Sequence, residues 1–548
     1  MKKSFLSNLH TIKKELKPFF NFSVNDWQDV VSLILGGILV VIIFFQAYFL
    51  ELNYDEAYTY LNTGRWDNVW QIYQFRIANT HFLNSLLMSV TTLFFPYNDV
   101  AIRLPAILFG LFYVAISISL AKQFRNKLLL LGLLFFFYFF TLYLSMARGY
   151  GMSATCVLAM VFVYKNQAEF KNWFLTFSIF GLLALYGNYI AIPIISVFGA
   201  YIFVVDFKFK LPPVTKKSLY WLIGIFLLGV WGFISVTKAG KPLYGAFDKS
   251  FIEAISLDWL ARFIGGYDTS VYEISNKLGF LVKIAGIISA AFGIGILGTY
   301  IFGKKQNVVG MVTLLSLFLI FVISTVGSKP LPTGRVLIPF WPLIVVSLLE
   351  IIEYATWRLN KRIIYLVNVG FLLALSFNYF GHFSKFWSAS FANAKEFRAL
   401  SFVKNYEFEG NPSEVYFADK ILKDGDLGIR PEDFYYLAQE RRREKIIDYL
   451  SKNTPNEQFI FKNSTIRVFI AKRIFSVGLN NPNTMDSVKI TLYSNKDLVF
   501  EKKVVLSSGK TVNNKFKHLL LPFPVLPKTD YLVFESLTDN RSYEYFLE

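Results

Sequence analysis

The feature that most constrains this chain is a succession of apolar runs, each close to the length of a membrane span, separated by short connectors rich in Lys and Arg. A transmembrane helix needs about 20 mostly apolar residues, because the hydrocarbon core of a bilayer is about 30 Å thick. Runs of this character lie at 29–50, 103–121, 128–146, 150–164, 173–188, 189–206, 219–237, 278–302, 308–326, 336–356 and 363–381. The sequence therefore predicts a polytopic α-helical membrane protein with about eleven transmembrane helices.

The composition supports this prediction and excludes the common soluble classes. Of the 548 residues, 54% are hydrophobic and only 17% are charged, whereas a soluble protein carries about 25% charged residues. A net charge of +18 suggests a nucleic-acid partner in a soluble protein, but here the basic residues lie between apolar runs, as in cytoplasmic loops, so no nucleic-acid partner is expected. The single cysteine, Cys156, excludes disulfide frameworks and Cys-rich metal sites.

The positions of the basic residues also predict the orientation in the membrane. Residues 1–28 form a Lys-rich cytoplasmic tail before the membrane domain, 29–381. The apolar segment at 81–96 is short for a span, and the basic connectors all fall on the cytoplasmic side only if it does not cross. We therefore expect an interfacial helix there, within a long external loop at 51–102, and a second external loop at 238–277.

Residues 382–548 are polar and are expected to form a separate extracytoplasmic domain. Its first part, 393–451, has a mixed, partly helical pattern. The remainder alternates apolar and polar residues in the short runs IRVFIAKRIF, SVKITLYS, LVFEKKVVL and YLVFES. Turn-forming residues at 480–483, 495–497 and 507–510 separate these runs. The pattern predicts a soluble α+β domain with a β-sheet-rich end.

Two adjacent carboxylates, Asp55 and Glu56, follow the first predicted span. One interpretation is a solvated helix start, because acidic side chains stabilise helix N-termini. The other is catalysis, because a carboxylate beside a substrate hydroxyl can act as a general base. Neighbouring residues on a helix do not share a face, so at most one of the two can point at a given substrate atom, and the other would have an orienting role or stay solvated.

Five further segments lie near the expected outer ends of the spans. They are HFLN from His81, RLPAILFG at 103–110, SMARGYG at 145–151, ALYGNY at 184–189 and GRVLIPFWPL at 334–343. Together with the acidic pair, they resemble the membrane glycosyltransferases of the GT-C class over residues 30–380. The nearest branch contains the protein O-mannosyltransferase-like and lipid A aminoarabinose transferase-like proteins. The chain departs from this pattern at Asn188, where a His is common, at Met146, where a Glu is frequent, and after His81, where the usual prolines are missing.

The resemblance implies that a sugar moves from a polyprenyl-phosphate-linked donor to an acceptor lipid, glycan or protein, by inverting displacement without a nucleotide. Asp55 stands at the family position of the catalytic base. The departing phosphate is an anion close to lipid, where arginine can bind it through two hydrogen bonds. Arg148 and Arg335 suit this role, since both are flanked by apolar sequence on the side where basic residues are disfavoured. Further candidates for the donor site are His81, Arg103, Tyr150 and Lys329.

The second external loop is rich in aromatic residues and is expected to cover the site or bind the acceptor, through Tyr244 and Arg262. Asn188, in the ALYGNY segment, is the third candidate for the acceptor site or the lid. The resemblance also implies a location in the cell (inner) membrane. An interfacial aromatic belt is the alternative interpretation of this loop. A snorkelling interfacial cation is the alternative for Arg103, Lys329 and Arg262. No cofactor and no metal-ligand spacing is evident, although carboxylates are suitable ligands for a divalent cation.

Two other function classes stay open. A lipid-linked sugar transporter or flippase would have a similar composition, but transporters tend to carry ionisable groups near the bilayer midplane and to have repeated halves. Here the ionisable residues lie at the outer ends of the spans, which favours surface chemistry. A non-catalytic scaffold of an envelope polysaccharide complex is the third interpretation, because of the departures from the family pattern.

Overall fold

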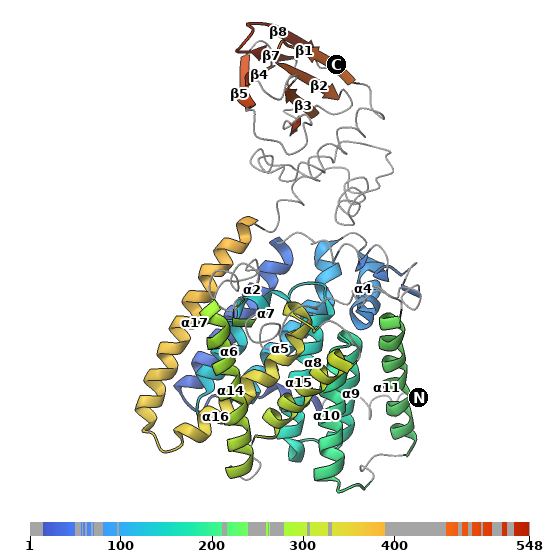
Figure 1. The fold of residues 1–548 in the computed structure, drawn as a ribbon, viewed down its shortest axis with the longest axis vertical. Helices are drawn as coiled ribbons and strands as arrows, with labels where there is room; N and C mark the ends of the chain where they lie inside the picture. Colours follow the sequence, from blue (N-terminus) through green and yellow to red (C-terminus); the bar gives the residue numbers. More distant parts are fainter. Residues whose placement is uncertain are drawn as a thin grey trace. The chain divides into compact units, whose positions relative to one another are not determined.

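The computed structural model describes most of the helical part of the chain and eight strands (Figure 1). The described residues are 15–49, 56, 59–60, 63–66, 69–70, 81–95, 98–210, 216–238, 259–260, 262, 279–303, 307–326, 331–389, 456–469, 474–479, 485–494, 497–506, 518–522 and 531–546. The chain divides into two compact units, Met1–Trp387 and Ser388–Glu548. The boundary expected at 381/382 lies inside a continuous helix, Lys361–Ala389.

The first unit is helical. Its described elements are η1 (Lys17–Phe20), α2 (Trp27–Phe49), α4 (Phe82–Phe94), α5 (Asp99–Ala121), α6 (Lys127–Phe135), α7 (Tyr138–Leu142), α8 (Gly149–Lys165), η3 (Gln167–Glu169), α9 (Trp173–Gly187), α10 (Ala191–Tyr201), η4 (Ile202–Asp206), α11 (Lys216–Lys238), α14 (Gly279–Phe302), α15 (Val308–Val326), η6 (Gly334–Phe340), α16 (Trp341–Thr356) and α17 (Lys361–Ala389). The helix expected at 81–96 is α4.

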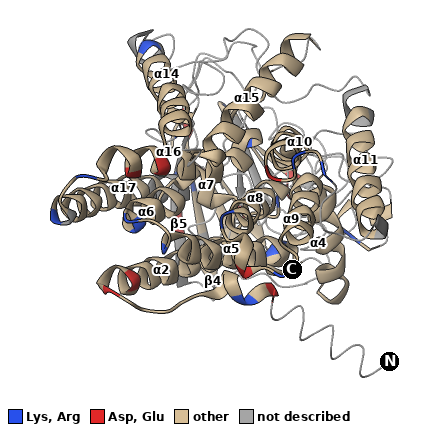
Figure 2. Cartoon of the chain, turned by 90° about the horizontal axis from the view of Figure 1, so that it is seen from below, with Lys and Arg blue, Asp and Glu red and all other residues tan. Residues whose placement is uncertain are grey.

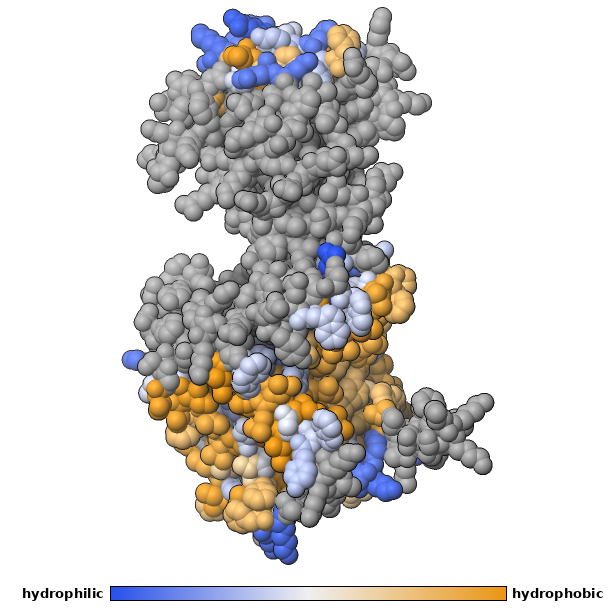
Figure 3. Space-filling model, turned by 90° about the vertical axis from the view of Figure 1, so that its right-hand side faces the viewer, coloured by the Kyte–Doolittle hydropathy of each residue, from blue (hydrophilic) through white to orange (hydrophobic). Residues whose placement is uncertain are grey.

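Six of the described helices are long and apolar enough to cross a membrane. They are Trp27–Tyr48, Asp99–Ala121, Lys283–Phe302, Val308–Val326, Gly334–Thr356 and Arg362–His382. Large hydrophobic side chains are exposed on the outside of the helices, and the helical unit is largely orange in Figure 3. Apolar side chains facing outward are expected where lipid, not water, is the solvent. The first unit is therefore a multi-pass membrane domain.

The predicted count of about eleven spans is not met by the described helices. The expected span at 128–146 is broken near Phe136 into two short helices, α6 and α7. The spans expected at 150–164 and 173–188 are α8 and α9, of 17 and 15 residues. The span expected at 189–206 corresponds to a shorter apolar helix, Ala191–Asp206. The run expected at 219–237 lies within α11, which has 23 residues. Apolar runs in the sequence show which segments of the chain are shielded from water, but they do not show where a kink or a turn interrupts a helix.

The core of this unit surrounds α8. Every residue from Gly149 to Val163 is buried, and α5, α9, η6 and α16 pack around the helix. A helix that is apolar on all sides is expected in such a central position. The described part of the expected N-terminal tail also belongs to this core, because the Phe19 ring is fully buried. It contacts the rings of Phe112, Phe162, Phe170 and Phe180 at centroid distances of 5.1 to 5.4 Å.

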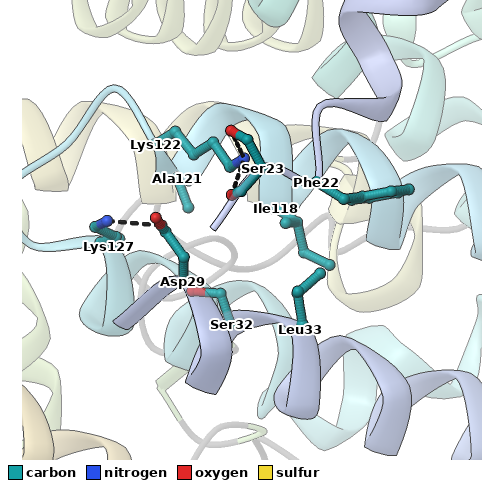
Figure 4. Close-up of a pocket in the computed structure, with 9 residues that line it drawn as sticks. All are labelled: Phe22, Ser23, Asp29, Ser32, Leu33, Ile118, Ala121, Lys122 and Lys127. Atoms are coloured by element: carbon teal, nitrogen blue, oxygen red, sulfur yellow. Dashed lines mark hydrogen bonds and ion pairs between the residues drawn. The ribbon is translucent and has the colours of Figure 1, made fainter. Parts of the chain in front are cut away.

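Charged connectors meet at one end of the helices, which we call the basic end. Lys122 Nζ donates to Ser23 O at 2.6 Å, and Lys127 pairs with Asp29 at 2.7 Å; both contacts line a small pocket (Figure 4). Arg125 donates to the carbonyl O of Trp357 at 2.9 Å, and Lys165 pairs with Glu350 at 2.6 Å. The rest of the helical surface carries few charges (Figure 2). Connectors expected on one side of the membrane are thus joined to one another.

The second unit contains two four-stranded antiparallel sheets. One has the order β1 (Asn456–Ile460), β2 (Ser464–Phe469), β3 (Ile474–Leu479) and β6 (His518–Pro522); the other has the order β5 (Asp497–Leu506), β4 (Asp486–Ser494), β7 (Tyr531–Ser536) and β8 (Ser542–Phe546). The Phe459 ring of β1 contacts Phe534 of β7 at 5.5 Å and Tyr543 of β8 at 5.2 Å, so the sheets pack face to face. The predicted sheet-rich end is confirmed, whereas 393–451 lies outside the described residues.

The loop between β7 and β8 is held by Asp539. Its carboxylate accepts the backbone N–H of Lys462 at 2.7 Å and that of Arg541 at 3.1 Å. Partial burial raises the pKa of Asp539, but these hydrogen bonds to the charged form outweigh it, and the pKa lies below its ordinary value of 3.8. The charged carboxylate therefore stabilises the contact between this loop and the β1–β2 turn.

Candidate active site

Glu56 and Arg103 form a buried ion pair. Arg103 Nε donates to Glu56 Oε1 at 2.9 Å and Arg103 Nη2 donates to Glu56 Oε2 at 2.8 Å. The side chains are 0% and 1% exposed, respectively. Arg103 Nη1 donates to the carbonyl O of Ala47, near the end of α2, at 3.1 Å. This two-pronged arrangement is the strongest pairing of arginine with carboxylate, and it ties the chain after α2 to the start of α5.

The same carboxylate reaches the segment between α7 and α8. Glu56 Oε1 accepts the backbone N–H of Ala147 at 2.7 Å, and Asn84 Nδ2, in α4, donates to the Ala147 carbonyl O at 2.9 Å. Both of these side chains are fully buried. The two backbone groups of Ala147 are therefore held by side chains from two other parts of the chain, immediately before Arg148.

Arg148 is the N-cap residue of α8, with an extended backbone (φ −131°, ψ 136°). Its side chain is 1% exposed, and its Cζ lies 5.4 Å from the centre of the Tyr150 ring. The His81 ring packs edge-on against Tyr150 at 4.6 Å, and His81 Nδ1 is hydrogen-bonded to the carbonyl O of Gly187 at 2.9 Å. We call Arg148, Tyr150 and His81 the arginine cluster; it lies where α4, α8 and α9 meet.

Two glycines allow this close packing at the start of α8. A Cβ at Gly149 would lie 2.0 Å from the carbonyl O of Gly187 and 2.8 Å from His81 Nδ1. A Cβ at Gly151 would lie 2.1 Å from the carbonyl O of Tyr143. No side chain fits at such distances from a backbone oxygen, so the glycines set the distance between the arginine cluster and the neighbouring helices.

Asn188 and Arg335 lie next to this region. Asn188 is 9% exposed, and its Nδ2 donates a long hydrogen bond of 3.4 Å to the carbonyl O of Val336. Val336 follows Arg335 in η6, and the Arg335 side chain is half-buried. The ALYGNY and GRVLIPFWPL segments, far apart in the sequence, are thus in contact.

The described part of the second predicted external loop packs against the same elements. Gly334 has a left-handed backbone (φ +55°), and a Cβ there would lie 2.9 Å from Arg262 Nη2. The Arg262 Cζ lies 4.6 Å from the centre of the Phe139 ring. Trp259 contacts Trp341 at 5.2 Å between ring centroids. Trp259 and Arg262 are therefore anchored on α7, η6 and α16 by aromatic and cation–π contacts.

Eight of the eleven predicted site residues can be compared with the structure. Asp55, Tyr244 and Lys329 lie outside the described residues. His81, Arg148, Tyr150 and Asn188 are brought together around the start of α8, with Arg335 and Arg262 on the adjoining η6. Glu56 was predicted as a catalytic carboxylate and Arg103 as a ligand of the donor phosphate. In the structure these two side chains bind each other.

Sequence reasoning missed Asn84. The HFLN segment drew attention to His81, yet Asn84 carries the hydrogen bond to the Ala147 carbonyl O. An Asn in a helix whose neighbours are mostly Leu, Phe, Ser and Thr is itself a signal, because a buried amide needs partners when no water is present. The role of the Ala147 backbone had no signal in the sequence, since any residue other than proline supplies the same two groups.

No protein-family model matches the chain, and no curated protein or solved structure matches it either. The function has to be argued from the site. Arginine stays protonated in proteins, so Arg148 places a fixed positive charge in a nearly water-free position beside the Tyr150 ring. Such a position attracts a group with negative charge. Among the described residues, no group of three or more His, Cys, Asp or Glu side chains is arranged to hold a metal ion.

Proposed function

We propose that this protein is a membrane glycosyltransferase that moves a sugar from a polyprenyl-phosphate-linked donor to an envelope acceptor. The observation that carries the proposal is the convergence of five separate sequence segments around the start of α8, with a buried arginine among them. Buried charge is costly in a membrane domain and is usually retained for function.

Arg148 is the proposed ligand of the donor phosphate. Leaving-group departure places negative charge on the phosphate oxygens, and a fixed guanidinium in a low-dielectric setting stabilises that charge much more strongly than one in water. Arg335, half-buried on η6, is the proposed second ligand. The Tyr150 ring lies against the arginine side chain and the His81 ring packs on Tyr150, and both rings are proposed to line the place of the sugar.

The proposed reaction is a single displacement at the anomeric carbon. Asp55 accepts the proton of the acceptor hydroxyl or amine, the acceptor atom bonds to the anomeric carbon, and the carbon–oxygen bond to the phosphate breaks. The electron pair of that bond leaves with the polyprenyl phosphate. Glu56 is engaged with Arg103 and Ala147, which leaves Asp55 as the proposed base of the acidic pair.

The proposed location is the cell (inner) membrane, with the N-terminus and the basic end in the cytoplasm. The gathering of Lys122, Arg125, Lys127 and Lys165 at one end supports this orientation, because cytoplasmic connectors are enriched in Lys and Arg. The arginine cluster and the C-terminal unit then belong to the extracytoplasmic side, where the lipid-linked donor and the envelope acceptor meet.

The test is sugar transfer by the full chain in lipid. Purified wild type and Asp55→Asn are incubated with a panel of radiolabelled polyprenyl-phosphate sugars and an envelope extract as acceptor. We expect transfer by the wild type and a loss of at least about 100-fold in Asp55→Asn. Asp99→Asn, an acidic residue in the first turn of α5, is the matched control and should keep the activity. Absence of transfer with every donor would refute the proposal and favour a scaffold or a transporter.

A further inference from the structure

We infer that Glu56 is a positioning residue for Arg148: with Arg103 and Asn84, it fixes the peptide units on both sides of Ala147 and thereby the place of the Arg148 guanidinium. The inference rests on the proposed function for the identity of the ligand that Arg148 binds. It assigns a different role to the second carboxylate of the acidic pair, and a first role to Asn84.

The surroundings of the Glu56 carboxylate argue against proton transfer to it. Oε1 accepts from Arg103 Nε and from the backbone N–H of Ala147, and Oε2 accepts from Arg103 Nη2, at 2.7 to 2.9 Å. The side chain is 0% exposed. A general base must lie within hydrogen-bond reach of the proton that it removes. A substrate hydroxyl would reach these oxygens only by displacing a buried ion pair.

The hydrogen bonds of Ala147 act directly on Arg148. The Ala147 carbonyl O belongs to the planar peptide unit that also contains Arg148 N and Cα, so the hydrogen bond from Asn84 fixes the point from which the Arg148 side chain starts. The Arg148 N–H also donates to the carbonyl O of Met146 at 2.7 Å, which makes the turn tight. Beyond Arg148, the contact of Gly149 with the backbone of α9 fixes the chain again. The Arg148 backbone is therefore held on both sides.

Two variants distinguish a positioning role of Glu56 and Asn84 from proton transfer by Glu56. Glu56→Gln keeps an oxygen that can accept the Ala147 N–H but removes the charge that holds Arg103. Asn84→Leu removes the donor to the Ala147 carbonyl O and changes no charge. The matched control is Glu353→Gln at the basic end, where the carboxylate likewise accepts a backbone N–H across the helices, that of Asn126 at 2.8 Å.

The first readout is transfer kinetics. A displacement of about 1 Å at a substrate-binding group can cost about 100-fold in rate, so Glu56→Gln and Asn84→Leu should lower kcat/KM for the donor by about 10- to 100-fold. The acidic limb of the pH–rate profile should stay in place. In an Arg148→Ala background, each change should lower kcat/KM by less than about a further twofold, because the effects of residues that act through one another do not add in free energy. A lost acidic limb in Glu56→Gln, or full multiplication with Arg148→Ala, would overturn the inference.

The second readout does not need activity. Phenylglyoxal modifies accessible arginines, and peptide mapping reports the modification of each one. Arg148 should react faster in folded Glu56→Gln and Asn84→Leu than in the wild type, and at the wild-type rate in Glu353→Gln. Unchanged labelling of Arg148 in both variants would refute the positioning role. If Arg148 is labelled faster in the two variants but the wild type transfers no sugar from any donor, the proposed function is refuted and the positioning role of Glu56 and Asn84 stands.

Discussion

Gly149→Ala removes the space on which the packing of the candidate site depends. The added methyl group would lie 2.0 Å from the carbonyl O of Gly187, whereas ordinary contact begins at 3.4 Å. The start of α8 and the end of α9 would have to separate by about 1.4 Å. The obstacle is a backbone atom, so no rotamer change relieves it. We expect a destabilisation near the upper end of the range for overpacked cores, about 3 kcal/mol.

The only cysteine of the chain provides the assay. Cys156 lies in α8 and is 0% exposed, so a fluorogenic maleimide reports the opening of this helix as the detergent-solubilised protein is heated. Gly149→Ala should lower the midpoint by roughly 5 to 10 °C. Gly199→Ala is the control, because a Cβ there has nothing within 4 Å, and it should melt with the wild type or slightly above it. A Gly149→Ala protein that melts like this control would refute the described contact between α8 and α9.

Three further predictions concern other parts of the molecule. Phe19→Ala should lower the free energy of unfolding by about 3 to 5 kcal/mol, because it leaves a cavity enclosed by aromatic rings. Phe20→Ala should lower it little, because the Phe20 side chain is 49% exposed. The maleimide melting assay compares the two variants. The lowered pKa of Asp539 means that its stabilisation is complete above about pH 3.8 and is lost as the pH falls through the lower folded value. An acid titration followed by amide hydrogen exchange of the strands β7 and β8 should show Asp539→Asn to be less acid-sensitive than the wild type. In the folded protein at 25 °C, Cys156 should resist maleimide until denaturant is added, and immediate labelling would show that α8 is accessible.

The sequence predicted the membrane class and the sheet-rich end of the second unit, because each depends on local patterns, whereas the segments that lie around α8 were identified by their resemblance to a family. Apolar runs, alternating apolar and polar residues and an arginine flanked by apolar sequence are all visible along the chain. The partner that a charged side chain binds is not visible along the chain. Glu56 and Arg103 are 47 positions apart, and nothing in either neighbourhood distinguishes an arginine that binds a phosphate from one that binds a carboxylate. The burial of Phe19 was equally hidden, since it follows a Lys-rich stretch that is typical of a solvated tail.

The complete enclosure of α8 has a consequence for how the chain tolerates change over evolution. From Gly149 to Val163 every side chain is buried, so this helix has no face on which substitutions are free. In related chains it should vary little whether or not they share an activity, because packing alone restrains it. Conservation within α8 would then be weak evidence for a common reaction. The pairing of Asn84 with the residue before Arg148 would be better evidence, since an apolar side chain at position 84 would pack equally well but could not make the hydrogen bond.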